Sequence, residues 1–219
     1  MSVTNRRWAA HGRVRDLALR VVRLHVGLAG FGVSLALMVR ARLGLDPWDV
    51  LHQGIARLLE VRLGWVVIAV SLMVLAAWIP LRQRPGFGTV SNAVVVGLVV
   101  NVAVAVIPSP RALVARAVML AVAIVLNGIS TGLYIGAGLG PGPRDGLMTG
   151  LAARGHSIRA VRTIIEVSAL AIGFALGGSV GIGTIAYAAS IGPLVHLFLP
   201  RLTLPSSPRR CPSEERQPA

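Results

Sequence analysis

The chain of 219 residues repeats part of its own sequence at a constant offset. The segment LGLDPWDVLHQGIA begins at Leu43, and LGPGPRDGLMTGLA begins at Leu139. A second block, GFGT at 86–89, returns 95 positions later as GIGT at 181–184, so one deletion separates the two blocks. An internal repeat of this length predicts two copies of one structural unit. The residues that recur 96 positions apart are Gly32/Gly128, Gly44/Gly140, Pro47/Pro143, Asp49/Asp145, Leu51/Leu147, Gly54/Gly150 and Ala56/Ala152.

The composition places the repeat in a membrane. Hydrophobic residues make up 54% of the chain and charged residues only 14%, whereas a soluble domain carries about 25%. The 22 basic residues are all arginines and outnumber eight acids, so the net charge is +14. Because these arginines lie between apolar segments, we expect them to orient helices and to contact anionic lipid headgroups. The bilayer is therefore the expected partner, and nucleic acid is not.

Six apolar segments are long enough to approach the roughly 20 residues that a membrane-spanning helix needs. Several are rich in glycine and alanine, which suits close packing between membrane helices. The predicted fold is all-α: a polytopic transmembrane helical bundle in two repeats, 21–108 and 112–200. A basic segment, 1–20, precedes the repeats, and a disordered cytoplasmic tail, 201–219, follows them. The expected spans are 21–39, 64–81, 88–107, 117–137, 161–178 and 182–200.

Arginine counting gives the orientation of these spans. With the N-terminus inside, 16 arginines fall in the inside segments and six in the outside segments, which favours cytoplasmic positions for both termini. Since each half has three spans, the second half crosses in the opposite sense, as an inverted repeat. If one segment does not cross, the repeat becomes parallel instead. No cleavable signal peptide is recognised, so the first span is expected to remain as an anchor.

The repeated Pro-x-Asp motif predicts a short helix in each half. Pro suits the first helical position, and an acid in the first turn faces the positive end of the helix dipole. We expect helices at about 47–60 and 143–153, which are too short to span. Each would lie at the interface or enter the bundle as a broken, re-entrant helix. The motif residues are Gly44, Asp46, Pro47 and Asp49 in the first copy, and Gly140, Gly142, Pro143 and Asp145 in the second, with Asp46 and Gly142 as the N-caps.

Two interpretations of Asp49 and Asp145 stay open. In transporters built from inverted repeats, broken helices place their ends near a central site. Asp49 and Asp145 would then face each other and bind a cation or a polar solute. Alternatively, each acid only caps its own helix and pairs with a nearby arginine, which for Asp145 is Arg144.

Glu166 is the other candidate, because it lies in the middle of the fifth predicted span. A carboxylate at this depth is costly and should face the bundle with a partner. Arg162 lies one helical turn earlier, so a local ion pair is one interpretation. The other is a carboxylate coupled to a proton or a solute, with Arg162 as its counter-ion. The first half has no acid at the matching position.

The remaining motifs are structural. Thr89 and Thr184 are expected as N-caps of the third and sixth spans. The glycines from Gly136 to Gly142 do not match a dinucleotide-binding fingerprint. A single cysteine, Cys211, and scattered histidines predict no metal site, and no arrangement typical of an enzyme or of cofactor binding is present.

The string GLYIGAGLGPGPRDGLMTGL, the acid Glu166 and the segment GGSVGIGT resemble the YczE-like family of bacterial integral membrane proteins, also written YczE/YyaS/YitT. The resemblance covers about 24–200 and is strongest over Gly132–Gly150 and Gly177–Gly192. It implies a multi-pass protein of the bacterial plasma membrane. It assigns no activity and no site residues.

Three functions follow as hypotheses. The first is a small-solute transporter or permease with its site between the repeats, formed by Asp49, Asp145 and Glu166, with Arg162. The second is a membrane accessory or scaffold that transports nothing. The third is the substrate-binding subunit of a larger transporter. A homo-oligomer and a membrane partner protein are both compatible with the sequence.

Overall fold

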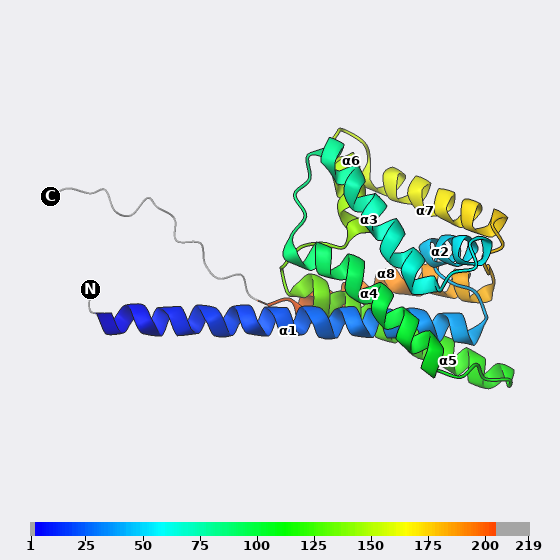
Figure 1. Ribbon diagram of the computed structural model, residues 1–219, viewed down its shortest axis with the longest axis horizontal. Coiled ribbons are helices and arrows are strands. Elements are labelled where there is room, and N and C mark those ends of the chain that lie inside the picture. Colours follow the sequence, from blue (N-terminus) through cyan, green and yellow to red (C-terminus); the bar gives the residue numbers. More distant parts are fainter. Residues whose placement is uncertain (1–2, 205–219) are drawn as a thin grey trace.

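The chain folds into helices in the computed structural model, which describes residues 3–204, with side chains from residue 16 onwards. No strand occurs in this part, so the prediction of an all-α fold is confirmed. Cys211 and most of the predicted tail lie outside the described residues. The helices are α1 (Val3–Ala41), α2 (Pro47–Leu58), α3 (Leu63–Leu81), α4 (Phe87–Val106), α5 (Leu113–Gly136), α6 (Pro143–Ala152), α7 (Ile158–Ala175) and α8 (Ile182–Leu202) (Figure 1).

Five helices of the described part are long and apolar enough to cross a membrane: the Asp16–Ala41 part of α1, and α3, α4, α5 and α8. The sixth predicted span corresponds to α7, which is not among them. Its 18 residues include Arg159, Arg162 and Glu166, and charges of this kind oppose insertion unless they are sheltered or paired. The crossing of α7 therefore stays a prediction.

The two halves pack around a central pair of antiparallel helices, α1 and α5 (Figure 1). In the first half, α4 packs on α1; in the second half, α8 packs on α5. The short helices are exchanged, since α2 packs mainly on α7 and α6 mainly on α3. The part of α1 around Arg23 and the end of α8 lie at the same end of the bundle, where the Arg23 guanidinium donates to the Leu202 carbonyl.

Contacts between the halves recur at the spacing of the sequence repeat. The Gly183 N–H donates to the Leu43 carbonyl at 2.7 Å, and the Gly88 N–H donates to the Leu139 carbonyl at 2.8 Å. Each loop before a short helix thus docks on the first turn of the last helix of the other half. Gly44 and Gly140 provide the turns in these loops, with φ of +118° and +128°, a conformation that favours glycine.

Arginines close the antiparallel α1–α5 pair at both ends. Arg116 donates to the Ala41 carbonyl at 2.7 Å, and Arg20 donates to the Ala137 carbonyl at 3.1 Å. The two donors, Arg20 and Arg116, are 96 positions apart, and so are the two acceptors, Ala41 and Ala137, which is the spacing of the sequence repeat. A guanidinium at a helix C-terminus satisfies carbonyls that have no partner within the helix. Two arginines that lie between the first and second predicted spans have the same role. Arg40 donates to the Val104 carbonyl, and Arg57 donates to the Gly177 carbonyl.

The last helix of each half begins three residues earlier than the threonine caps predicted. The N-cap residues are Gly86 and Gly181, not Thr89 and Thr184. Each threonine occupies the third helical position, where its hydroxyl accepts from the N–H of the cap glycine, at 3.2 Å and 3.3 Å. This is the reciprocal half of a capping box, which is why a threonine near a helix start does not by itself locate the cap.

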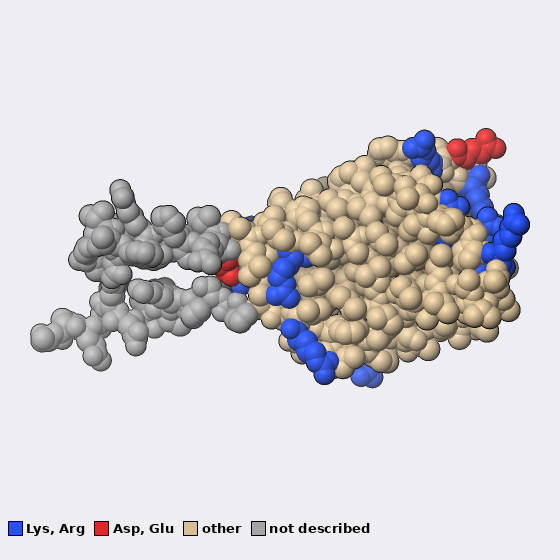
Figure 2. Space-filling model, turned by 90° about the horizontal axis from the view of Figure 1, so that it is seen from below, with Lys and Arg blue, Asp and Glu red and all other residues tan. Residues whose placement is uncertain are grey.

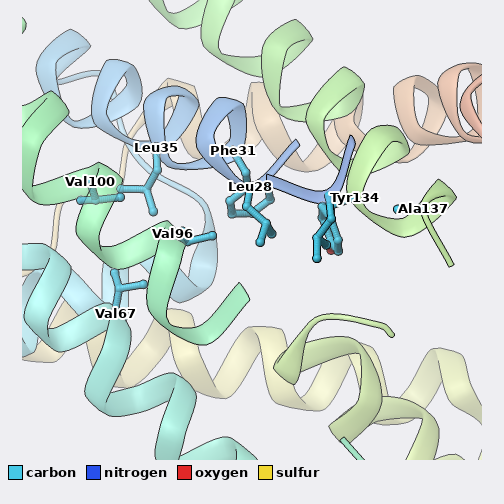
Figure 3. Packing of buried hydrophobic residues seen from close by; sticks show 9 residues of the cluster. Leu28, Phe31, Leu35, Val67, Val96, Val100, Tyr134 and Ala137 are labelled. Carbon is cyan, nitrogen blue, oxygen red and sulfur yellow. The ribbon is translucent and has the colours of Figure 1, made fainter. Parts of the chain in front are cut away.

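The largest interior cluster joins α1 to α4 and α5 (Figure 3). Leu28 and Leu35 are 0% and 1% exposed and pack with Val100 of α4. The outer surface is apolar as well, and Figure 2 shows the basic side chains of this face gathered towards the two ends. Large apolar side chains such as Val102 and Val114 are exposed on it. An uncharged belt between basic ends is the surface that a bilayer stabilises.

Candidate functional site

Two short helices begin where the repeated motif predicts them. Pro47 and Pro143 each occupy the first turn of their helix. Asp46 caps α2, and its carboxylate accepts from the Asp49 N–H at 2.7 Å. Gly142 takes the same position before α6 and has no side chain to do so. The predicted caps and the starts of both helices are confirmed.

The starts of both helices line one cavity of about 960 Å³. All four candidate site residues lie on its wall, so the structure brings together side chains that are up to 117 positions apart in the sequence. Apolar side chains from α1, α3 and α4 also line the cavity, among them Phe31, Leu35, Val67, Val70 and Val96. The candidate residues are Asp49, Asp145, Arg162 and Glu166.

Arg144 links the two short helices across the cavity. Its Nη1 atom lies 3.5 Å from Oδ2 of Asp46. Its guanidinium lies 5.8 Å from the ring centre of Phe31 and 5.7 Å from that of Trp48, which are distances of cation–π contacts. One interpretation expected a local ion pair of Arg144 with Asp145. Arg144 instead pairs with Asp46, which lies at the start of the other short helix.

The carboxyls at the start of α2 are buried. Asp46 and Asp49 are 2% and 3% exposed, and the Nδ1 atom of His52 lies 3.1 Å from Oδ1 of Asp49. Burial raises the pKa of Asp49 to about 7 and, with the nearby Asp49 charge, raises that of Asp46. Burial lowers the pKa of His52 to about 3. His52 is therefore neutral at physiological pH, and Asp49 exchanges a proton in that range.

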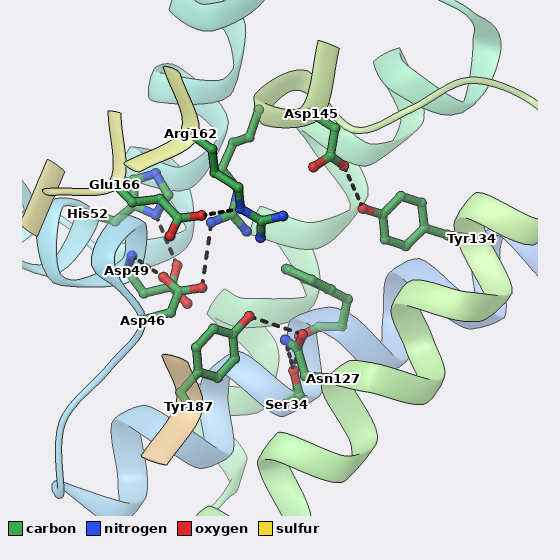
Figure 4. A network of polar contacts seen from close by, with 12 residues as sticks. Ser34, Asp46, Asp49, His52, Asn127, Tyr134, Asp145, Arg162, Glu166 and Tyr187 are labelled. Carbon is green, nitrogen blue, oxygen red and sulfur yellow. Dashed lines mark hydrogen bonds and ion pairs between the residues drawn. The ribbon is translucent and has the colours of Figure 1, made fainter. Parts of the chain in front are cut away.

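On the other side of the cavity, the Tyr134 hydroxyl donates to Oδ2 of Asp145 at 3.1 Å (Figure 4). A second chain of hydrogen bonds lies below it, from Tyr187 to Asn127 at 3.2 Å and from Asn127 to Ser34 at 2.9 Å. These bonds hold the aromatic hydroxyls of α5 and α8 at the cavity. Tyrosines of this kind keep a carboxylate oriented without neutralising it.

Glu166 and Arg162 form the local ion pair that their spacing predicts, with Nε and Oε1 3.0 Å apart. Both side chains also line the cavity, and Figure 4 shows them on the same side as Asp49. The pair is more open than the α2 carboxyls, since 35% of the Glu166 side chain and 61% of the Arg162 side chain are exposed. Glu166 and Arg162 therefore form the predicted local ion pair and also line the cavity.

Several residues of the cavity wall were not among the candidates, including Arg144 as a bridge between helices, His52 and Trp48. Trp48 is 7% exposed, and its indole N–H has no hydrogen-bond partner within the described part of the chain. The repeat carried a signal for two of them, because Trp48 and Arg144 occupy equivalent positions. Within residues 3–204, no three His, Cys, Asp or Glu side chains are placed to hold a metal ion.

Taken together, the apolar belt, the spanning helices and the polar cavity define an integral membrane protein with a solute-sized cavity between its halves. The chain belongs to the family described as "Family of unknown function (DUF6198)", whose model matches residues 18–200.

Relatives of similar length support this membership. An uncharacterized protein of Haemophilus influenzae is 42% identical over 193 residues, which is 88% of each chain. The uncharacterized membrane protein YczE of Bacillus subtilis is 31% identical and covers 85% of this chain and 88% of its own. The uncharacterized protein YyaS of the same organism is 24% identical over 80% of this chain and 90% of its own. The resemblance to the YczE-like family is confirmed. No solved structure matches the chain.

Proposed function

We propose that the protein is a small-solute transporter of the bacterial plasma membrane. The observation that carries the proposal is the cavity of about 960 Å³, because acids from both halves line it together with two helix starts, and those of the first half are buried. Ligand sites usually combine an apolar wall with a few placed polar groups. In transporters built from repeats, such sites lie at the repeat interface, next to broken helices.

An inverted repeat is part of the proposal. The equivalent hydrogen bonds of Gly183 and Gly88, and of Arg116 and Arg20, support a twofold relation between the halves. Trp48 and Arg144 are equivalent by sequence and contact each other, as residues beside a twofold axis do. In this arrangement α7 crosses the membrane as the counterpart of α3, and its ion pair lies next to the cavity.

Rocking of one half against the other would expose the cavity to each side of the membrane in turn. The exchanged packing of α2 on α7 and of α6 on α3 makes each short helix a link between the halves. We further propose that both termini are cytoplasmic. The part of α1 around Arg23 meets the C-terminal end of α8 at one end of the bundle, and the arginine excess falls on that side.

A thermal-shift screen of the detergent-purified protein against ions, metabolites and vitamins tests the proposal, followed by uptake of each hit into proteoliposomes. A ligand bound only by the folded state stabilises it by about 2.7 kcal/mol at a hundredfold excess over Kd. The transporter proposal expects a hit that is lost in Asp145→Asn or Glu166→Gln and that is taken up by the vesicles.

The other two functions predict different results in the same experiment. A substrate-binding subunit binds its ligand but shows no uptake alone. A scaffold gives no hit although both variants fold, and it copurifies with a partner. Either pattern would replace the transporter proposal.

A further inference from the structure

We propose that the cavity binds a small organic cation with a guanidinium or ammonium group, and that Arg144 holds its place in the structure described here. The inference rests on the proposed function and names the class of solute. The solute cation and the Arg144 side chain compete for the same carboxylate and the same aromatic rings.

The surroundings of Arg144 are those of a cation site. Oδ2 of Asp46 lies 3.5 Å from the Nη1 atom of Arg144. The ring centres of Phe31 and Trp48 lie 5.8 Å and 5.7 Å from its guanidinium carbon. Acids with aromatic faces are the general means by which proteins recognise organic cations. The group that fills this site belongs to the chain itself, and it comes from the helix of the opposite half.

The charges of the cavity wall favour a cation over an anion. Four carboxyls line the cavity, from Asp46, Asp49, Asp145 and Glu166, against two guanidiniums, from Arg144 and Arg162. The two guanidiniums pair with Asp46 and Glu166. Within the described residues, neither Asp49 nor Asp145 forms an ion pair with an arginine. Asp49 contacts His52 and Asp145 accepts from Tyr134, so both acids, equivalent in the repeat, remain available to a positive charge that comes from outside the chain.

A second observation points to a ligand. The indole N–H of Trp48 lacks an acceptor within the described part of the chain, although the residue is 93% buried and lines the cavity. A buried donor without a partner costs free energy. A solute that carries an oxygen or nitrogen acceptor beside its cationic group would satisfy it.

Competition with Arg144 has a consequence that a simple binding site would not show. Because the side chain occupies the site in the free protein, the apparent affinity for a solute cation is reduced by the fraction of molecules in which the site is closed. Removal of the guanidinium should therefore strengthen binding of a cation. If Arg144 were instead an anchor for an anionic solute, its removal would abolish binding.

Isothermal titration of agmatine, a small guanidinium and ammonium compound, into the purified protein in nanodiscs tests this. We expect Arg144→Gln to bind agmatine at least about tenfold more tightly than wild type, and Arg144→Lys to remain close to wild type. Asp49→Asn and Asp145→Asn should each weaken binding at least about tenfold. Since Arg144→Gln leaves Asp46 without its partner, Trp48→Leu provides a second test in case that variant does not fold. It keeps every charge of the cavity and should weaken agmatine binding, because it removes one aromatic face of the site.

Two results would overturn the inference: no agmatine binding to any variant, or binding of glutamate that is lost in Arg144→Gln. Uptake into proteoliposomes separates this inference from the proposed function. Agmatine binding without uptake supports the cation site and contradicts transport. Uptake of an anion, with no agmatine binding, supports transport and overturns the cation site.

Discussion

The starts of α2 and α6 follow the same backbone path with different side chains. In both, a glycine of positive φ makes the turn, proline occupies the first helical turn, and an aspartate follows two residues later. Yet Trp48 of the first copy corresponds to Arg144 of the second, and Asp46 corresponds to Gly142. The repeat therefore preserves the geometry that brings two helix starts to one cavity, and it leaves the side chains free to make the cavity asymmetric.

The packing of the two short helices differs in the same way. Val50 of α2 is fully buried against the glycines Gly173 and Gly178 of the second half. At the equivalent position of α6 stands Gly146, which lies under the ring of Trp78. In the first copy the short helix carries the larger residue and α7 carries the glycine. In the second copy the short helix carries the glycine and α3 carries the larger residue, so each helix pair meets at a small residue.

The largest effect is expected from Gly146→Val, which puts the side chain of the first copy into the second. A Cβ at this position would overlap the Trp78 ring, and overpacking of this kind costs about 3 kcal/mol. Thermal unfolding in detergent should show a strongly lowered midpoint. Gly192→Ala is the control, because a Cβ there meets nothing within 4 Å. An unchanged midpoint for Gly146→Val would contradict the exchanged packing.

Asp46→Ala removes the acid that only the first copy has. The change eliminates the cap of α2, which contributes about 1 kcal/mol, and leaves the Arg144 guanidinium without its ion pair. We expect a loss of about 2 to 3 kcal/mol in the free energy of unfolding. Asp46→Asn should recover the cap but not the pair, and should fall between. Asp16→Ala, which breaks a more exposed pair with Arg20, should cost less than about 1 kcal/mol.

Asp49, the buried acid that follows Pro47 in the first copy, should make the free energy of unfolding depend on pH. The pKa of Asp49 is raised from its ordinary 3.8 to about 7, so the folded protein holds a proton that the unfolded chain releases. This stabilisation is present below pH 4 and is lost as the pH rises through about 7. Between pH 6 and pH 8 the loss should be about 1 kcal/mol. Asp49→Asn should flatten the dependence, and a slope unchanged by it would show that another group titrates.

The smallest effect is expected from Tyr134→Phe, which removes the hydrogen bond to the acid of the second copy. The neutral donor contributes about 1 kcal/mol or less. Tyr187→Phe is the matched variant, because the Tyr187 hydroxyl donates to Asn127 and not to an acid. Both should lower the unfolding midpoint slightly, but only Tyr134→Phe should weaken solute binding, because it removes the hydrogen bond that orients Asp145. Identical binding curves for the two variants would remove Tyr134 from the site.

Local features were predictable from sequence, and contacts across the molecule were not. The starts of α2 and α6 followed from proline and the capping residues, because these act on the backbone within one turn. The pair of Arg162 with Glu166 followed from helical spacing. The link from Arg144 to Asp46 joins residues 98 positions apart, so only the packing of the two halves reveals it. Thr89 and Thr184 misplaced the caps because the same hydroxyl can serve at the cap or at the third position.

Labelling of a cysteine in the cavity tests most directly whether the cavity opens to both sides of the membrane. In a Cys211→Ser background, Ser71→Cys puts the single thiol on the cavity wall. A membrane-impermeant maleimide should label it in right-side-out vesicles and also in inside-out vesicles, while Val102→Cys, on the apolar outer surface, stays unlabelled in both. Labelling of Ser71→Cys from one side only, or from neither, would contradict a transport site between the two halves.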